Sequence, residues 1–341
     1  MSNFPPQPGG TILPMTGDSW LVVLTPGSSR SPCVSGPPVR VIDMSRRTVL
    51  ITGTSQGLGR GIAFELAERG HTVLLHGRDR TRLEAVASEV RDTVSGATVR
   101  TYLADLADLD QVHDMAARIR AAEPRLDALV NNAVAGGGAE PLRREVSRQG
   151  HELRFAVNHL APYALTRDLL PLLTASAPAR VVNVASIGQE AVDFDDVMLE
   201  RGYEGLRAYC RSKLAMIMAT FELAAELKGT SVTVNTLHPA HLMDTAGVRA
   251  YGLTPVTGIE EGVRPTVRLV LDPDLEDTTG RYFDQFTDTR AHEQAYDAKA
   301  RKRLMELTHR LLDLRPPHAQ QPPPRDRGSR HSMPGSASGG R

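Results

Sequence analysis

The chain has 341 residues, enough for one large α/β domain or two small ones. Its 40 basic and 40 acidic side chains cancel, so no global field attracts nucleic acid or an anionic membrane. The 2 cysteines are too few for a disulfide framework, and no apolar run approaches the roughly 20 residues that span a bilayer. The composition therefore predicts a cytoplasmic protein with no membrane span and no nucleic-acid partner.

The two ends of the chain differ in composition from its middle. Residues 1–45 are rich in Pro, Gly and Ser and lack sustained periodicity, which predicts a disordered extension. Because Met44 directly precedes the first regular pattern, a translation start there is a second interpretation, and a targeting peptide is a third. Residues 315–341 are Pro-rich, then Ser/Gly-rich, and predict a disordered tail. The folded domain is expected over residues 46–314.

Between these ends, short β-branched runs alternate with amphipathic helical stretches. Apolar strands separated by helices indicate a parallel sheet covered on both faces, because parallel strands need crossover connections. The pattern predicts a single α/β domain with a doubly wound Rossmann fold and a seven-stranded, mostly parallel sheet. The expected strands are residues 48–51, 72–75, 99–103, 128–130, 180–184, 232–237 and 281–283.

A glycine-rich turn, Thr52-Gly-Thr-Ser-Gln-Gly-Leu-Gly59, follows the first expected strand and opens a helix that stops at Gly70. Its glycines permit a tight turn and a close backbone approach, and a helix start offers amide donors where the dipole favours an anion. A glycine-rich turn alone is weak evidence. After the first strand of a βαβ unit, it predicts that the diphosphate of a dinucleotide binds here.

The end of the second strand bears on the choice between NADP and NAD. An acidic residue there would hold the ribose hydroxyls of NAD and repel an added phosphate, but Gly77 and Arg78 occupy this place. The forked donors of Arg78 can pair with a 2′-phosphate, so NADP(H) is favoured over NAD. The alternative interpretation is that Arg78 is a surface charge, and Arg60 could assist it or be solvated.

Polar residues also follow the third and fourth expected strands. Asp105-Leu106 comes after the third strand, where a carboxylate could accept a hydrogen bond from the adenine amino group. Asn131-Asn-Ala-Val134 comes after the fourth, where asparagines often only lock a turn.

The segment Tyr209-Cys-Arg-Ser-Lys213 opens a helical run and carries the candidate chemistry. Residues four apart lie on one helix face, and a nearby ammonium group favours the phenolate form of a phenol whose ordinary pKa is about 10. Tyr209 is therefore a candidate general acid/base, although the same spacing occurs on many solvated helices. Ser186, at a strand end, could donate a hydrogen bond to the same substrate oxygen.

With the glycine-rich turn, Asn131-Asn-Ala, Ser186 and Tyr209-x-x-x-Lys213 in this order, residues 46–314 resemble the short-chain dehydrogenase/reductase family, classical type. Val157-Asn-His-Leu-Ala-Pro-Tyr163 and Leu237-His-Pro239 are similar to its retinol-dehydrogenase-like branch. The resemblance implies that Ser186 polarises the substrate oxygen and that Tyr209 exchanges the proton. It also implies that Lys213 lowers the pKa of the tyrosine and holds the nicotinamide ribose, while Asn158 keeps a helix locally open for a proton-relay water.

The same resemblance implies the remaining cofactor contacts. The residues expected around the diphosphate are Gly53, Ser55, Gly57, Leu58 and Gly59. Asp105 and Leu106 would flank adenine, Asn132 and Ala133 the neighbouring ribose, and Pro239 the nicotinamide. The chain departs from the family pattern at Val134, Ala185 and Ala240, where Gly, Ser and Gly are usual. These side chains could shift the nicotinamide or narrow the pocket, but they remove no proton-transfer group.

Residues 189–206 and 240–263 follow strand ends and could form a pocket wall and a lid. Their apolar residues fit a small-molecule substrate that is a moderately hydrophobic ketone, aldehyde or secondary alcohol. We expect an NADP(H)-dependent oxidoreductase; the alternative is a non-catalytic dinucleotide-sensing protein with the same fold. No metal site is expected, because His238 and His241 lack a third ligand and are better explained by loop-rigidifying or substrate-lining roles. A homodimer or homotetramer, formed through the helices bearing Asn158 and Tyr209, is compatible with the resemblance.

Overall fold

The computed structural model describes residues 10–14, 20–24, 46–136, 143–250 and 252–314. Two short strands, β1 (Gly10–Pro14) and β2 (Trp20–Leu24), pair with each other in antiparallel orientation. The rest of the expected extension, residues 1–45, and the whole expected tail, residues 315–341, lie outside the described residues.

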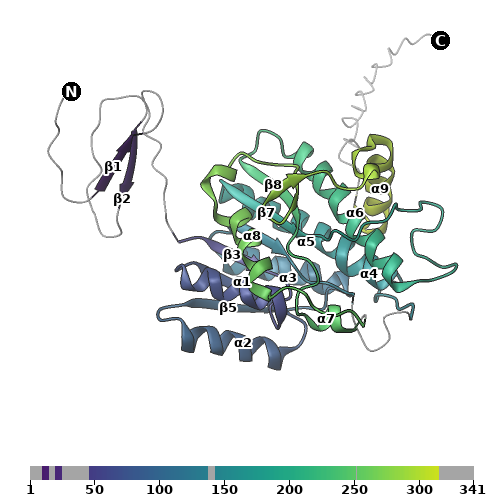
Figure 1. Cartoon of the computed structure of the whole chain (residues 1–341), viewed down its shortest axis with the longest axis horizontal. Coiled ribbons are helices and arrows are strands. Elements are labelled where there is room, and N and C mark those ends of the chain that lie inside the picture. Colours follow the sequence, from purple (N-terminus) through teal and green to yellow (C-terminus); the bar gives the residue numbers. More distant parts are fainter. Residues whose placement is uncertain (1–9, 15–19, 25–45, 137–142, 251, 315–341) are drawn as a thin grey trace, which may run out of the picture.

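An eight-stranded sheet forms the centre of the domain (Figure 1). Its strands are β3 (Thr48–Ile51), β4 (Thr72–Gly77), β5 (Thr98–Leu103), β6 (Ala128–Asn131), β7 (Ala179–Val184), β8 (Val232–His238), β9 (Tyr282–Asp284) and β10 (Thr287–Thr289). They lie in the order β10-β9-β8-β7-β6-β3-β4-β5. Because β3 pairs with β4 on one side and β6 on the other, the strand order reverses at β3, where doubly wound sheets bind ligands.

The seven strands from β3 to β9 run parallel, as predicted. The sequence analysis missed β10, which pairs with β9 in antiparallel orientation. Its three residues are polar and exposed, so they carry no apolar pattern. A hairpin at the sheet edge needs only a short turn, and this one is two residues long.

Helices cover both faces of the sheet (Figure 1). One face carries α1 (Gly57–Glu68), α2 (Arg80–Thr93) and α8 (Ile259–Leu271); the other carries α3 (Leu109–Ala122), α5 (Ala161–Ala175) and α6 (Gly205–Glu226). The short α4 (Leu153–Phe155) continues through a π-helix (Ala156–Leu160) into α5. The remaining elements are α7 (Ala246–Ala250), the 3-10 turns Pro273–Leu275 and Glu293–Tyr296, and α9 (Ala298–Leu311).

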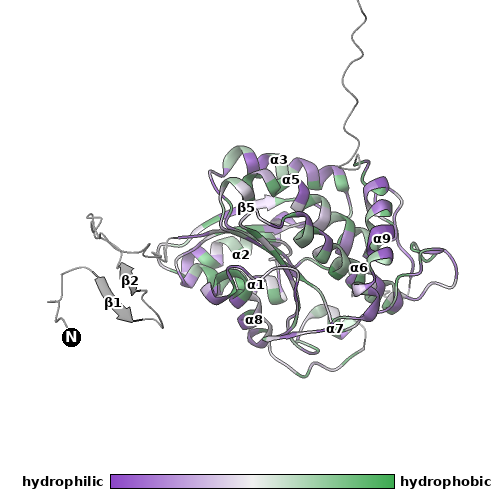
Figure 2. Cartoon of the chain, turned by 90° about the horizontal axis from the view of Figure 1, so that it is seen from above, coloured by the Kyte–Doolittle hydropathy of each residue, from purple (hydrophilic) through white to green (hydrophobic). Residues whose placement is uncertain are grey.

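The burial pattern explains this layered arrangement. Every residue of β3, β4, β6, β7 and β8 is buried, as a parallel sheet with two covered faces requires. The helices are instead amphipathic, with hydrophilic outer and hydrophobic inner surfaces (Figure 2). None of the helices in the described part of the chain combines the length and hydrophobicity that a bilayer crossing requires.

Helix α9 packs on α6, and hydrogen bonds join it to the π-helix and to the start of α5. His159 hydrogen-bonds Thr308 at 2.8 Å, and Tyr163 hydrogen-bonds His309 at 2.7 Å. Helix α9 therefore covers part of the surface of the two helical segments that bear Asn158 and Tyr209.

Candidate active site

The glycine-rich turn joins β3 to α1 at the point where the strand order reverses. Gly53 and Gly57 adopt φ angles of +74° and +57°, which L side chains rarely adopt. Position 59 has no room for a side chain, because an added Cβ would overlap the carbonyl oxygen of Gly53 and lie 2.5 Å from Asn132 Nδ2. Gln56 at the helix N-cap forms no capping side-chain bond, so amides of the first turn remain available to an anion. This cradle fits a cofactor diphosphate.

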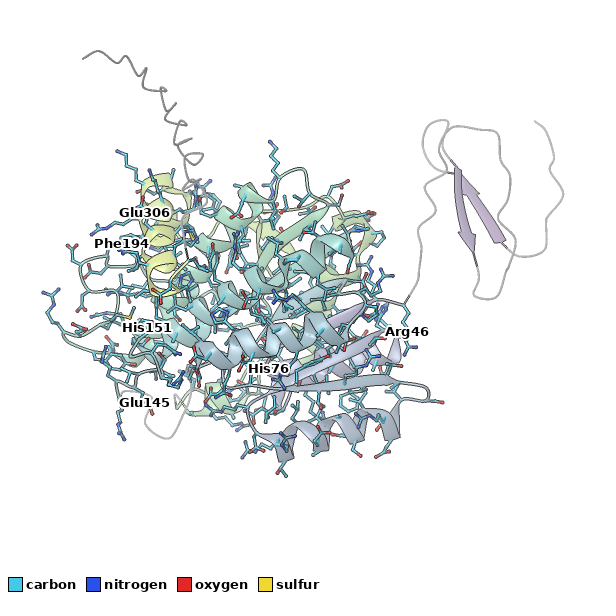
Figure 3. The ribbon with its side chains drawn as sticks, turned by 180° about the vertical axis from the view of Figure 1, so that it is seen from behind. Arg46, His76, Glu145, His151, Phe194 and Glu306 are labelled. Atoms are coloured by element: carbon cyan, nitrogen blue, oxygen red, sulfur yellow. The ribbon has the colours of Figure 1, made fainter. Side chains whose placement is uncertain are left out.

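His76, at the end of β4, holds the turn in place (Figure 3). Its Nδ1 accepts a hydrogen bond from the Gly53 N–H at 3.2 Å, and its Nε2–H donates to the Ala104 carbonyl at 3.1 Å. Burial lowers the pKa of His76 to about 4, so the ring is neutral at pH 7. The sequence analysis did not single out His76; its only signal was a polar residue inside an apolar strand.

The residues after β6 hold the turn from the other side. The hydroxyl of Thr52 accepts hydrogen bonds from the N–H groups of Asn132 and Ala133, at 2.9 and 3.0 Å. The Asn132 side-chain amide donates to the Thr52 carbonyl at 2.8 Å and to the Gly53 carbonyl at 3.2 Å. The structure therefore brings the two expected cofactor segments together, and the Asn132 side chain locks the turn.

The adenosine end of the expected cofactor site lies after β4. A Cβ on Gly77 would be only 2.6 Å from the Ser55 hydroxyl, so a side chain at this position would require that hydroxyl to move. Arg78 is exposed, and within the described part of the chain it pairs with no carboxylate. Arg60, by contrast, forms an ion pair with Glu89, so its guanidinium already has a carboxylate partner.

Asp105 and Leu106 lie beyond β5. The Asp105 carboxylate accepts the Ala107 N–H at 2.9 Å, and the Asp105 N–H donates to Gln111 at 3.0 Å. Leu106 is buried. Their position beside the end of β4 is compatible with the adenine contact that the resemblance implies.

Lys213 is buried within α6, with only 2% of its surface exposed. Its Nζ donates to the Val184 carbonyl at the end of β7, at 2.8 Å, and lies 5.8 Å from the centre of the Tyr209 ring. Burial lowers the pKa of Lys213 to about 7. An ammonium group here acts on the phenol at short range in a poorly hydrated environment.

Ser186 and Tyr209 converge on Gly188. A Cβ on this glycine would lie 3.5 Å from Ser186 Oγ and 3.9 Å from Tyr209 Cε1. The Gly188 N–H also donates to Ser186 Oγ at 3.0 Å, which fixes the hydroxyl. On the opposite side of the ring, a Cβ on Gly136 would lie 3.5 Å from Tyr209 Cδ2. The Tyr209 ring is therefore held between two glycines that the sequence analysis did not identify.

Asn158 lies in the π-helix between α4 and α5 and is fully buried. Its amide accepts the Ala135 N–H at 2.8 Å and donates to the Ala135 carbonyl at 3.0 Å. It also donates to Ser212 Oγ at 2.9 Å, and that hydroxyl donates to the Tyr209 carbonyl. Asn158 thus connects the loop after β6 to the helix that carries Tyr209.

A polar cluster of the buried Glu152 and Arg154 and the half-buried Tyr203 anchors the segment that precedes α6. Glu152 caps α4 by accepting the Phe155 N–H at 2.7 Å and accepts the Tyr203 hydroxyl at 3.1 Å. Arg154 donates to the Tyr203 hydroxyl, lies 3.6 Å from Glu152 and donates to the Gly136 carbonyl at 3.4 Å. The cluster therefore ties the expected pocket wall to the glycine that contacts the Tyr209 ring.

Segment 240–263 reaches across to the glycine-rich turn. A Cβ on Gly57 would lie 3.5 Å from Thr245 Cγ2. A Cβ on Gly262 would lie 3.4 Å from Pro239 Cβ and 3.3 Å from Leu58 Cδ1. The structure thus brings Pro239 and Leu58 together, as a shared cofactor site requires.

Apolar side chains are exposed around the site. Val134 follows β6, Ile187 follows Ser186, and Leu206 lies one helical turn before Tyr209; each exposes about half of its surface. Of the three departures from the family pattern, Val134 lies at this rim, whereas Ala185 and Ala240 are buried. In the described residues, no cluster of His, Cys, Asp or Glu has the composition of a metal site.

The comparisons with known proteins agree with this geometry. A family model described as short chain dehydrogenase matches residues 47–252. Human retinol dehydrogenase 13 is 35% identical over 294 residues, covering 81% of this chain and 88% of the relative. Mouse retinol dehydrogenase 14 is 35% identical over 300 residues, covering 80% and 87%.

Solved structures show the same fold. A protein from Mycobacterium paratuberculosis superposes with a TM-score of 0.65 and 28% identity, covering 80% of this chain and 95% of that one. A short chain dehydrogenase from Escherichia coli CFT073, solved as a complex with NADPH, gives a TM-score of 0.59 and 29% identity, covering 72% and 99%.

The chain therefore belongs to the short-chain dehydrogenase/reductase family, and it is an NAD(P)-dependent oxidoreductase. Within that family, the similarity to retinol dehydrogenases over most of the chain places it in the retinol-dehydrogenase-like branch.

Proposed function

We propose that this protein is an NADP(H)-dependent oxidoreductase that interconverts a moderately hydrophobic ketone or aldehyde and the corresponding alcohol, with Tyr209 as general acid/base. The observation that carries the proposal is the convergence of Ser186 Oγ and the Tyr209 ring on Gly188, beside a buried lysine. When bound, the nicotinamide supplies or accepts the hydride. The side chains supply the proton and stabilise the oxygen.

In the reducing direction, negative charge develops on the substrate oxygen. The Ser186 hydroxyl, held by the Gly188 N–H, donates a hydrogen bond to this oxygen, and the Tyr209 hydroxyl transfers its proton. The Lys213 ammonium stabilises the phenolate that remains. Asn158 holds helix α6, which carries Tyr209, against the loop after β6 through its hydrogen bonds to Ser212 and Ala135.

The preference for NADP(H) over NAD(H) is supported by the end of β4. Position 77 carries no acidic side chain, and a side chain there would displace the Ser55 hydroxyl; the adjacent Arg78 is an exposed guanidinium suited to a phosphate. The similar bacterial structures that were solved with NADPH or NADP are consistent with this preference. We expect Arg78→Ala to weaken NADPH binding by about tenfold or more and to leave NADH binding nearly unchanged. Arg82→Ala, at an equally exposed position on α2, is the control.

A hydrophobic substrate is supported by the apolar rim formed by Val134, Ile187 and Leu206. The related retinol dehydrogenases are named for a hydrophobic alcohol, which agrees with such a rim.

The proposal is tested with a panel of carbonyl compounds and alcohols, followed by the nicotinamide absorbance with NADPH and NADH. We expect Tyr209→Phe to lower turnover by about three orders of magnitude or more and to leave the Kd for NADPH within about twofold. If Tyr209→Phe kept most of the wild-type turnover, the role of Tyr209 as general acid/base would be refuted. A wild-type protein that binds NADPH but reduces none of the panel would favour the non-catalytic alternative.

A further inference from the structure

Three residues form one row across the carboxyl ends of β7, β8 and β9. His238 and Asp284 are direct neighbours in the parallel register of β8 and β9. On the other side, the Ala185 N–H donates to the Leu237 carbonyl at 2.8 Å, which continues the β7–β8 pairing and places Ala185 beside His238. Ser186 follows directly, so the row lies next to the proposed oxygen-binding hydroxyl.

This row faces the helix that carries Tyr209. Side chains two residues apart on a strand point to the same face, so Asp284 shares a face with Tyr282. The ring of Tyr282 packs in the apolar cluster that includes α6, and its hydroxyl donates to the Ser186 carbonyl at 3.1 Å. His238 and Asp284 therefore lie on the catalytic side of the sheet.

Two polar atoms of this row have no partner among the described residues. They are His238 Nε2 and Asp284 Oδ1, and both are buried; His238 as a whole is only 6% exposed. Burial lowers the pKa of His238, so its ring is neutral at pH 7. A buried polar atom without a partner is destabilising, and the methyl side chain of Ala185 can satisfy neither.

The backbone holds Asp284 at this position by a strained turn. Gln285, the next residue, has a φ of +53°, in the left-handed region that non-glycine residues rarely adopt. Its N–H donates to the His238 carbonyl at 2.8 Å. The hairpin of β9 and β10 thus fixes the carboxylate beside the imidazole.

We propose that His238 and Asp284 bind a hydroxyl group of the substrate, so that the enzyme prefers a hydroxylated carbonyl compound to its deoxy analogue. The inference rests on the proposed function and specifies the substrate class of the same site. A hydroxyl satisfies both atoms at once, because it donates to the carboxylate and accepts from the imidazole Nε2–H. The apolar rim then contacts the hydrocarbon part of the substrate.

The test compares ketones that differ only in one hydroxyl. Acetophenone, propiophenone and butyrophenone are each assayed with NADPH beside the derivative hydroxylated at the last carbon of the alkyl chain. We expect kcat/KM for at least one hydroxylated ketone to exceed that of its deoxy partner by about tenfold or more. In His238→Phe and Asp284→Leu the ratio of the two kcat/KM values falls to near one, because kcat/KM for the hydroxylated ketone falls further than that for its deoxy partner.

Asp288→Leu, on the exposed strand β10, is the matched control and retains the wild-type ratio. The deoxy ketone reports whether each variant is folded and active. The inference would be overturned if the wild type had equal kcat/KM for the two ketones of every pair, or if both variants kept the wild-type ratio. Either result would leave the reductase function intact. Absence of reduction with every ketone here and with the whole panel of carbonyl compounds and alcohols described above would overturn both.

Discussion

The imidazole of His76 bridges Gly53 and Ala104, which lie at the ends of different strands. It accepts from the Gly53 N–H at 3.2 Å and donates to the Ala104 carbonyl at 3.1 Å. Only the neutral ring with its proton on Nε2 can do both. The glycine-rich turn therefore depends on the protonation state of a buried histidine.

Stability is expected to fall as the pH drops from about 6.5 towards 4. The ordinary pKa of histidine is 6.5, and burial lowers that of His76 to about 4, so over this interval the unfolded chain binds a proton that the folded chain does not. The full effect of His76 is on the order of 3 kcal/mol. Urea unfolding at several pH values measures it. In His76→Gln, whose amide can form both hydrogen bonds, the slope should be shallower.

The control for this experiment is His241→Gln, since His241 is exposed. It removes one histidine from the surface while the bridge from Gly53 through His76 to Ala104 stays in place. Equal slopes for the wild type and His76→Gln would show that His76 does not carry the effect. His159, whose pKa burial lowers to about 3, contributes in the same direction in every one of these proteins.

Gly59→Ala is expected to impair cofactor binding. The added Cβ overlaps the Gly53 carbonyl and crowds Asn132, so the turn must shift. We expect the Kd for NADPH to rise by about 100-fold, which corresponds to roughly 3 kcal/mol. The change in the fluorescence of NADPH on binding measures this. Gly247→Ala, where the nearest atom to the added Cβ is 3.8 Å away, should bind as the wild type does; equal affinity in both variants would contradict the role of Gly59.

Lys213→Met is expected to stabilise the protein while abolishing activity. Burial lowers the pKa of Lys213 from 10.5 to about 7, which means that the folded protein disfavours the charged form. Removing the charge should raise the free energy of unfolding at pH 7 by about 1–4 kcal/mol. The gain should shrink as the pH rises from about 7 to 10.5, where the wild-type lysine is neutral only when folded. A destabilised variant at pH 7 would show that the Val184 hydrogen bond outweighs the desolvation.

Arg154→Met is expected to be strongly destabilising. It leaves the buried Glu152 without its cationic neighbour and removes a donor to the Gly136 carbonyl. Loss of one partner from such a pair typically costs about 3–5 kcal/mol. Urea unfolding measures the loss, and Arg201→Met, at an ion pair on the surface, should cost less than about 1 kcal/mol. Similar small losses in both variants would argue against a buried anchor.

Much of the fold could be predicted because its signals are local. The runs that became β3, β4 and β7 each contain consecutive apolar residues and are buried at every position, as in a parallel sheet covered on both sides. The edge strand β10 could not be predicted, because its three polar residues carry no strand pattern and form a strand only by pairing with β9.

The candidate site was predictable where spacing along one element carries the chemistry. Tyr209 and Lys213 lie four apart on one helix, and Gly53, Gly57 and Gly59 lie in one turn. These patterns are short-range, so the sequence alone determined the fold class, the glycine-rich turn and the tyrosine–lysine pair.

The tertiary structure alone decided which distant residues complete the site. His76 meets Gly53 across 23 positions, Gly188 and Gly136 hold the Tyr209 ring from different loops, and His238 lies beside Asp284 on the next strand. Contacts of this kind depend on strand order and register, which arise from packing of the whole sheet and leave no periodic trace in the chain.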